Sequence, residues 1–169
     1  VVEQAASFLQ PTLPYTLPPE TVMAGFALKV DVVDGHGSGV HIGGGLMFTN
    51  EHVVRNQVAA VVRGDDGSTH DAEILWTNAT RDVALLLVDA SEAIKSAELS
   101  CRALRVGEAI VSYGNPEEAD FVEMAGYGAG EAREVDPRNI MVPVDVAIIP
   151  GASGGPVVDG EGKLVGINA

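Results

Sequence analysis

The sequence has little cysteine, little positive charge and no long apolar run. Its single cysteine, Cys101, cannot form an internal disulfide, and as a nucleophile it would need a histidine nearby in space. No stretch of about 18 apolar residues indicates a membrane-spanning helix. Ten Lys and Arg against 24 Asp and Glu give a formal net charge of −14. Because nucleic acids and anionic membranes are bound by concentrated Lys and Arg, this charge argues against both as partners.

Aromatic residues are also scarce, whereas glycine is abundant. Four Phe, three Tyr and one Trp stand beside twenty Gly, which fits short strands joined by tight turns. A hydrophobic content of 46% excludes a disordered chain. A chain of 169 residues is long enough for one domain, or for two small subdomains that share a core.

Short apolar segments alternate with turn signals from residue 21 onward. The predicted strands cover residues 22–33, 37–42, 46–49, 59–63, 72–77, 83–88, 108–113, 121–125, 130–135, 140–144, 157–158 and 164–167. A short helical turn is expected at His52, with Asn50 as its N-cap by residue type. Residues 89–100 form a polar connection between two groups of strands. This regular spacing predicts antiparallel barrels and not a parallel sheet.

Residues 1–20 differ in composition from the rest of the chain. Four prolines between residues 10 and 19 fix φ and make this segment an extended arm. Its apolar side chains need something to pack on; they are Phe8, Leu13, Tyr15 and Leu17. The sequence leaves two partners open, the chain's own barrel and another subunit.

A serine framed by glycines occupies residues 150–156, which read Pro-Gly-Ala-Ser-Gly-Gly-Pro. A hydroxyl is a weak nucleophile at neutral pH, so a catalytic Ser153 would need a base to take its proton. It would also need backbone N–H groups aimed at the developing oxyanion. Glycine allows the φ and ψ values that turn successive N–H groups into one concavity. The alternative is a glycine-rich turn between two strands that carries no chemistry.

A histidine and an aspartate precede this serine in strand-like settings. His52 follows the apolar residues 46–49, and Asp82 opens the apolar run 83–88. The order His, Asp, Ser is that of the chymotrypsin-type triad. Other acidic residues compete for the role of Asp82; they are Asp65, Asp66, Asp71 and Asp89. The apolar run behind Asp82 favours it, because that run would hold the carboxylate at the rim of a packed barrel.

Seven segments together resemble a trypsin-fold serine protease of the HtrA type. They read GSGV (37–40), LMFTNEHVV (46–54), RDVAL (81–85), RVGE (105–108), GNP (114–116), DVAIIPGASGGPV (145–157) and KLVGIN (163–168). The resemblance covers most of the chain from about Gly37 onward. It implies an all-β fold with two antiparallel β-barrels of the chymotrypsin/trypsin type. Residues 21–95 would form the first barrel and residues 96–169 the second, behind the arm of residues 1–20.

The resemblance also implies a role for each site residue. Ser153 is the expected nucleophile, His52 the general base and then acid, and Asp82 the group that orients the imidazole. The oxyanion hole would be made by the loop Gly151, Ala152 and Ser153, through the N–H groups of its first and last residues. Position 152 is Ala where the family usually has Asn, which is tolerable because only the main chain is needed there.

Substrate preference is expected to follow from the residues ahead of the serine. Ala147, Ile148 and Ile149 would line the specificity pocket, and all three are apolar. We therefore expect cleavage after small or medium aliphatic residues. Ile149 replaces the usual Asn of the family, and nothing in the sequence explains this exchange.

The resemblance implies polypeptide substrates, no metal and no cofactor. The remaining histidines, His36, His41 and His70, stand beside turns without metal-ligand spacing, so we expect them at the surface. An extracytoplasmic location, periplasmic or secreted, is typical of the family. Its members also commonly form trimers through N-terminal segments, which would give the arm of residues 1–20 a partner in a second copy.

The chain departs from the family pattern after residue 168. Members continue with further strands of the second barrel, so this barrel is expected to be truncated at its C-terminal end. Three explanations stay open: a piece of a longer enzyme, strands supplied by a partner or a second copy, and a variant with an assembly role. The two function hypotheses are accordingly a serine endopeptidase and a non-catalytic or partner-completed trypsin-fold module.

Overall fold

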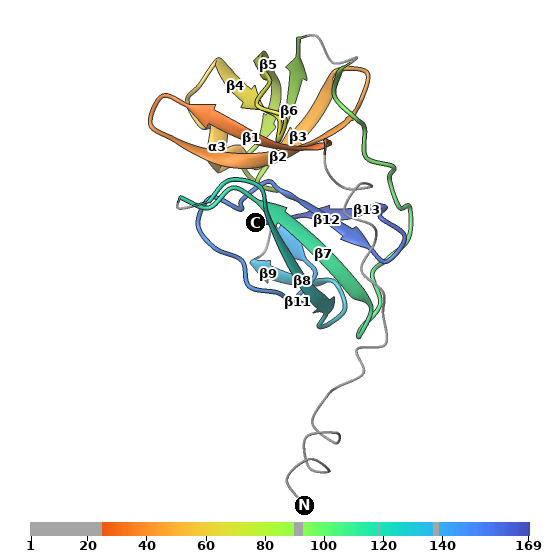
Figure 1. The fold of residues 1–169 in the computed structure, drawn as a ribbon. Helices are drawn as coiled ribbons and strands as arrows, with labels where there is room; N and C mark the ends of the chain where they lie inside the picture. Colours follow the sequence, from red (N-terminus) through yellow and green to blue (C-terminus); the bar gives the residue numbers. More distant parts are fainter. Residues whose placement is uncertain (1–24, 90–92, 118, 137–138) are drawn as a thin grey trace, which may run out of the picture.

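The computed structural model describes residues 25–89, 93–117, 119–136 and 139–169. The arm predicted at residues 1–20 lies outside the described residues. Within the described ranges the regular elements are strands, apart from the one-turn helix α3 (Glu51–Val54). Figure 1 shows the strands grouped into two units, one above the other. No helix among the described residues is long and apolar enough to cross a membrane.

The first unit is a closed six-stranded barrel. Its strands are β1 (Ala27–Val32), β2 (Gly35–Gly43), β3 (Leu46–Thr49), β4 (Ala59–Arg63), β5 (Thr69–Asn78) and β6 (Val83–Val88), in the spatial order β1-β2-β3-β6-β5-β4. The alternation in β4 explains its inward face, because Ala60 and Val62 are buried while their neighbours are exposed. Leu28, Met47 and Leu86 complete the interior with other apolar side chains.

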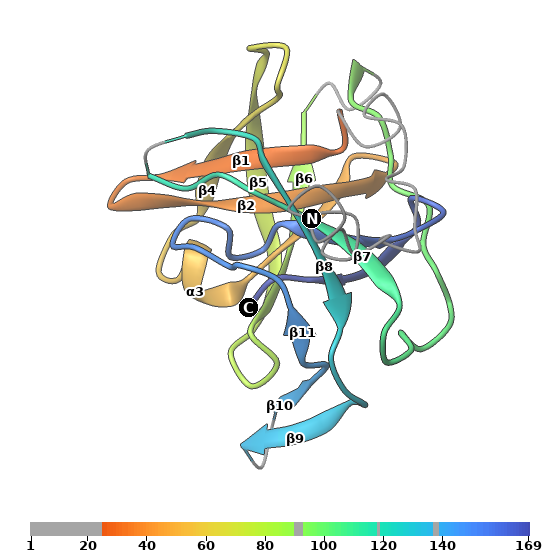
Figure 2. The same cartoon turned by 60° about the horizontal axis from the view of Figure 1, so that its bottom comes forward.

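The second unit is an open sheet and a hairpin. The sheet contains β7 (Ala109–Gly114), β8 (Val122–Gly128), β11 (Val144–Asp145), β12 (Pro156–Asp159) and β13 (Leu164–Ile167), in the order β11-β8-β7-β12-β13. The hairpin joins β9 (Arg133–Asp136) and β10 (Asn139–Met141), and it projects beyond the sheet in Figure 2. The all-β prediction is confirmed, with a half-barrel in place of a closed second barrel.

One predicted strand, residues 140–144, is wrong as a single element. Ile140 pairs with Glu134 in the hairpin, whereas Val144 pairs with Gly128 in the five-stranded sheet. Pro143 lies between them and has no N–H to donate to a ladder, so the chain changes partners there.

The two units share an apolar boundary and a connection that runs along both. Phe26 and Val40 of the first unit pack in one cluster with Val111 and Val158 of the second. In the connection, Ala97 donates its N–H to the carbonyl of His41 at 2.9 Å, and Leu164 donates to Glu98 at 2.7 Å. The connection therefore ties β2 to β13.

Candidate active site

His52 and Asp82 are brought together by neighbouring strands of the first barrel. His52 lies on α3 directly after β3, and Asp82 directly precedes β6, which pairs with β3. The Nδ1 of His52 lies 2.7 Å from Oδ2 of Asp82, and the His52 N–H donates to Oδ1 at 2.9 Å. Because a carboxylate only accepts, Nδ1 carries the proton, and Nε2 is the ring nitrogen left to act as a base.

The backbone of Asp82 is held by Asn50. Asp82 has φ of 50°, a left-handed conformation that non-glycine residues rarely adopt. Asn50 donates its side-chain amide to the Asp82 carbonyl at 2.9 Å. The predicted N-cap role of Asn50 is therefore wrong, since its side chain makes no cap hydrogen bond to α3. The amide supports the aspartate and not the helix.

The serine loop begins with a tight turn. Ala152 donates its N–H to the Ile149 carbonyl at 3.0 Å, and between them stand Pro150 and Gly151. Gly151 has φ of 94°, and a proline followed by a left-handed glycine is the pattern of a type II turn. The turn delivers the chain to Ser153.

The N–H groups of this loop divide into two sets. Those of Ala152, Gly154 and Gly155 donate to carbonyls of Ile149, Asn168 and Ala152, respectively, at 2.9–3.0 Å. No hydrogen bond from the N–H of Gly151 or Ser153 is described within the described ranges. The two N–H groups assigned to the oxyanion hole are thus the ones that the loop's own described bonds leave unused.

Gly154 packs so closely that a side chain has no room. A Cβ on this residue would overlap the Ser38 carbonyl and the Thr49 hydroxyl, and its φ of 83° is left-handed. The close approach places the residue after Ser153 directly against β2 and β3. The loop is therefore fixed to the barrel that carries the histidine.

Ser153 approaches α3 through β2. Its carbonyl accepts the N–H of Ser38 at 2.8 Å. A Cβ built on Gly37 would lie 2.7 Å from Val53 and 3.2 Å from the Ser153 carbonyl, so α3 and the loop converge on one point of β2. No hydrogen bond between the Ser153 hydroxyl and His52 occurs among those described, so the two side chains are neighbours that do not yet touch.

The residues predicted to line the specificity pocket lie between β11 and the serine turn. Ala147 is exposed, as are Ile148 and Ile149 at 41% and 42%. Three consecutive apolar side chains therefore face outward beside the loop, on the open side of the second unit.

The other histidines have different surroundings from one another. His41 was expected at the surface, but it is only 2% exposed, so that prediction is wrong. Its Nδ1 lies 2.9 Å from the Lys95 carbonyl, because the connection between the two units covers this part of β2. His36 is half-buried, and its Nε2 lies 2.9 Å from the Asn115 carbonyl.

Three polar residues around the loop received no role from the sequence. The Ser38 hydroxyl donates to the Gly151 carbonyl at 2.7 Å, and Asn115 donates to Ser38. The Asn168 amide donates to the Ala152 carbonyl at 3.2 Å. All three stand in segments that carry the family resemblance, and that position was the signal available.

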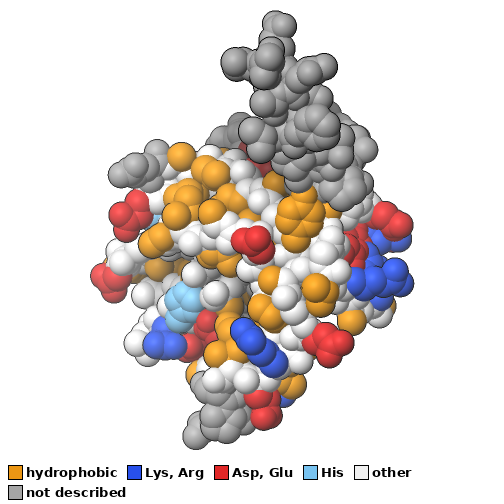
Figure 3. Space-filling model, turned by 90° about the horizontal axis from the view of Figure 1, so that it is seen from below, with side chains coloured by type: hydrophobic (Ala, Val, Ile, Leu, Met, Phe, Trp, Pro, Cys, Tyr) orange, Lys and Arg blue, Asp and Glu red, His pale blue; other side chains and the backbone are white. Residues whose placement is uncertain are grey.

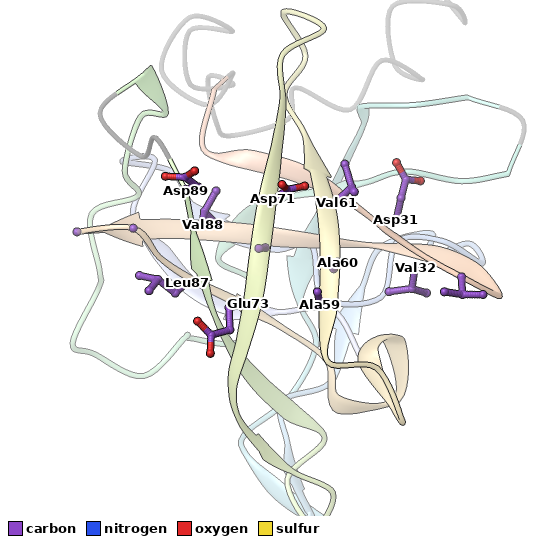
Figure 4. Close-up of a pocket in the computed structure, with 14 residues that line it drawn as sticks. Asp31, Val32, Ala59, Ala60, Val61, Asp71, Glu73, Leu87, Val88 and Asp89 are labelled. Carbon is purple, nitrogen blue, oxygen red and sulfur yellow. The ribbon is translucent and has the colours of Figure 1, made fainter.

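The largest hollow lies away from these residues. It measures about 950 Å³ and is formed on the first barrel by β1, β4, β5, β6 and the β2–β3 turn (Figure 4). Asp71 and Glu73 of β5 contribute carboxylates to it, and none of the predicted site residues lines it. The described part of the chain contains no group of three or more His, Cys, Asp or Glu side chains that could hold a metal ion. On the face shown in Figure 3, Lys and Arg are interspersed with Asp and Glu and form no extended basic patch.

Comparisons with known proteins agree with this geometry. A family model described as a trypsin-like peptidase domain matches residues 37–167. A probable periplasmic serine endoprotease DegP-like from Pseudomonas fulva is 37% identical over 128 residues, which cover 74% of this chain and 26% of that protein. Protease Do-like 1, chloroplastic, from Arabidopsis thaliana is 35% identical over 153 residues, which cover 85% of this chain and 35% of that protein. The chain thus spans about a quarter to a third of the length of these relatives.

A solved structure supports the same fold. The HtrA-type protease AlgW with tripeptide matches with a TM-score of 0.82 at 26% identity, over 88% of this chain and 52% of that one. This similarity confirms the predicted trypsin-type fold.

Proposed function

We propose a serine endopeptidase activity for this chain, which belongs to the HtrA-type family of trypsin-fold serine proteases. The observation that carries the proposal is the double contact between His52 and Asp82, at 2.7 Å and 2.9 Å. It fixes both the ring orientation and the tautomer that a general base requires. Ser153 lies in the loop that approaches the same point of β2.

The reaction runs through an ester on Ser153. The Ser153 hydroxyl oxygen attacks the carbonyl carbon of the peptide bond, and its proton passes to Nε2 of His52. The negative oxygen of the tetrahedral intermediate is bound by the N–H groups of Gly151 and Ser153. The C–N bond then breaks, and the leaving amine takes the proton from His52. A water molecule hydrolyses the ester by the same steps, with His52 again acting first as base and then as acid.

The substrate residue before the cleaved bond is proposed to be small or medium and aliphatic. Ala147, Ile148 and Ile149 offer only apolar surface beside the loop. A charged side chain placed against them would lose water without gaining an ion pair, which is costly.

A second candidate is a module that becomes active only when a partner strand is added. The edges of the five-stranded sheet are β11 and β13. Edge strands offer free N–H and C=O groups to an incoming strand, and peptides commonly bind in this way. The described hydrogen bonds also leave Ser153 and His52 unjoined, which suits a site that closes on binding.

A fluorophosphonate probe separates the two candidates. The probe reacts when an activated serine oxygen attacks phosphorus and displaces fluoride, so the adduct is read by intact mass. We expect one adduct on the 169-residue chain and none on Ser153→Ala. A well-folded chain that takes no label would favour the partner-completed module, and an adduct that persists in Ser153→Ala would contradict the assignment of the nucleophile.

A further inference from the structure

The hydroxyl of Ser38 makes three hydrogen bonds at the boundary between the two units. Its oxygen accepts the backbone N–H of Asn115 at 2.9 Å and the Asn115 side-chain amide at 3.0 Å. It lies 2.7 Å from the carbonyl oxygen of Gly151. Both Asn115 groups are nitrogens that can only donate, so they occupy the two lone pairs of the hydroxyl. The single proton of Ser38 must therefore point at Gly151.

Asn115 is itself fixed from several sides. Its side-chain amide also lies 3.3 Å from the Leu28 carbonyl, and its side-chain oxygen accepts the N–H of Phe121 at 3.0 Å. Ser38 is 1% exposed and Asn115 is 2% exposed. A buried network whose members are all satisfied holds one geometry, because any rotation leaves a polar atom unpaired.

Gly151 is packed against the same network. A Cβ on this residue would overlap the Asn115 carbonyl, and its φ of 94° depends on the absence of a side chain. The carbonyl that Ser38 holds belongs to the peptide between Gly151 and Ala152, the last peptide of the turn. Fixing this carbonyl restricts ψ of Gly151 and with it the orientation of the preceding Gly151 N–H.

We propose that Ser38 and Asn115 are positioning residues for the oxyanion hole, an inference that rests on the peptidase function proposed above. They touch neither substrate nor Ser153 Oγ in any described contact; they hold the Gly151 peptide in the turn that leaves its N–H unused. The contact crosses from β2 to the serine loop, so the first barrel sets the shape of a hole built from the second unit.

The test replaces Ser38 by Ala and compares it with Val30→Ala. Val30 is fully buried in the first barrel, and its side chain belongs to the barrel core, so its loss destabilises the fold without touching the network. For Ser38→Ala we expect kcat per folded molecule to fall about 10- to 100-fold with KM within about twofold, less than the 10²–10³ typical of deleting a donor outright. Val30→Ala should keep the kcat of the wild type.

A second measurement does not depend on activity. The Ala152 N–H closes the turn on the Ile149 carbonyl, so its hydrogen exchange reports whether the turn persists. We expect its protection to fall at least about tenfold in Ser38→Ala relative to Val30→Ala. Should Ser38→Ala fail to fold, Ser38→Cys keeps a weak donor of similar shape and is measured in the same way.

The outcomes distinguish the two proposals. If the wild type takes the fluorophosphonate label and Ser38→Ala matches Val30→Ala in kcat and exchange, the positioning role is overturned and the peptidase stands. If the wild type takes no label, the peptidase proposal fails for the isolated chain, and the exchange of Ala152 alone decides whether Ser38 holds the turn.

Discussion

The side-chain amide of Asn50 donates to the backbone carbonyl of Asp82 at 2.9 Å, while the Asp82 carboxylate accepts twice from His52. The two contacts act in series. Asn50 stabilises a left-handed backbone, a conformation that costs about 1–3 kcal/mol in a non-glycine residue, and that backbone aims the carboxylate. The orientation of the proposed base thus depends on a residue that does not touch it through any described side-chain bond.

Asn50→Ala should therefore weaken catalysis through Asp82. We expect kcat to fall about tenfold or more, because a small displacement of a catalytic group is expensive. Steady-state kinetics on a peptide substrate give the ratio. Gln57→Ala is a matched control, since the described hydrogen bonds include none from the Gln57 side chain. Equal kcat in the two variants would show that Asp82 holds its position unaided.

Asp82→Asn should abolish most of the activity while the fold persists. An amide can keep a hydrogen bond to the ring but stabilises the wrong tautomer and carries no charge, and in a trypsin-type triad this change costs about 10⁴ in kcat. Thermal unfolding should stay close to that of the wild type. Asp71→Asn, on the first barrel away from the site, is the comparison, and it should keep full activity.

Gly154→Ala should destabilise the protein. The left-handed backbone alone costs about 1–3 kcal/mol in a non-glycine residue, and the new Cβ would overlap the Ser38 carbonyl. Gly160→Ala is the control, because its φ is not left-handed and a Cβ there meets no atom within 4 Å. Urea unfolding of both variants gives the difference. Similar midpoints would mean that the loop can move away from β2 at little cost.

Acid should remove a contribution that Glu108 makes to stability. The hydrogen bond from Arg102 lowers the pKa of the Glu108 carboxyl below its ordinary value of 4.5. A carboxyl with a lowered pKa in the folded state stabilises the fold above 4.5, and the contribution is lost as the pH falls through the folded value. Glu108→Gln should therefore be less stable at pH 7 and lose less stability between about pH 5 and pH 3. Parallel unfolding curves over that range would contradict this.

A peptide library should show cleavage after Ala, Val, Leu or Ile. The reason is the apolar character of Ala147, Ile148 and Ile149, which gives a basic side chain no partner. The products are identified by mass spectrometry, with Ser153→Ala as the blank. A strong preference for Lys or Arg would exclude these residues as the determinants of specificity.

Local pattern was sufficient for many of the strands. The segments 46–49, 59–63, 83–88 and 164–167 were predicted with the bounds that the structure has, because each alternates or is wholly apolar between clear turn signals. The histidine and aspartate were likewise marked by the apolar runs beside them.

Long-range partners could not be predicted in this way. His41 is polar and next to a glycine turn, yet it is buried by a connection about fifty residues away in the sequence. Asn50 has the residue type of an N-cap, but a carbonyl on a neighbouring loop competes for its amide and wins. Ser38 stands in a segment that was recognised, and its role appears only when Gly151 and Asn115 are placed beside it.

Ser38 and Gly151 are 113 residues apart in the sequence. Contacts of such separation form slowly, and the N-terminal part of a growing chain generally folds first. A nascent chain with its first barrel folded would hold the His52–Asp82 pair while the Ser38 hydroxyl still awaited its acceptor. The order of synthesis would then act as a safeguard, since the newly made protein could not attack its neighbours on the ribosome before its second unit had folded.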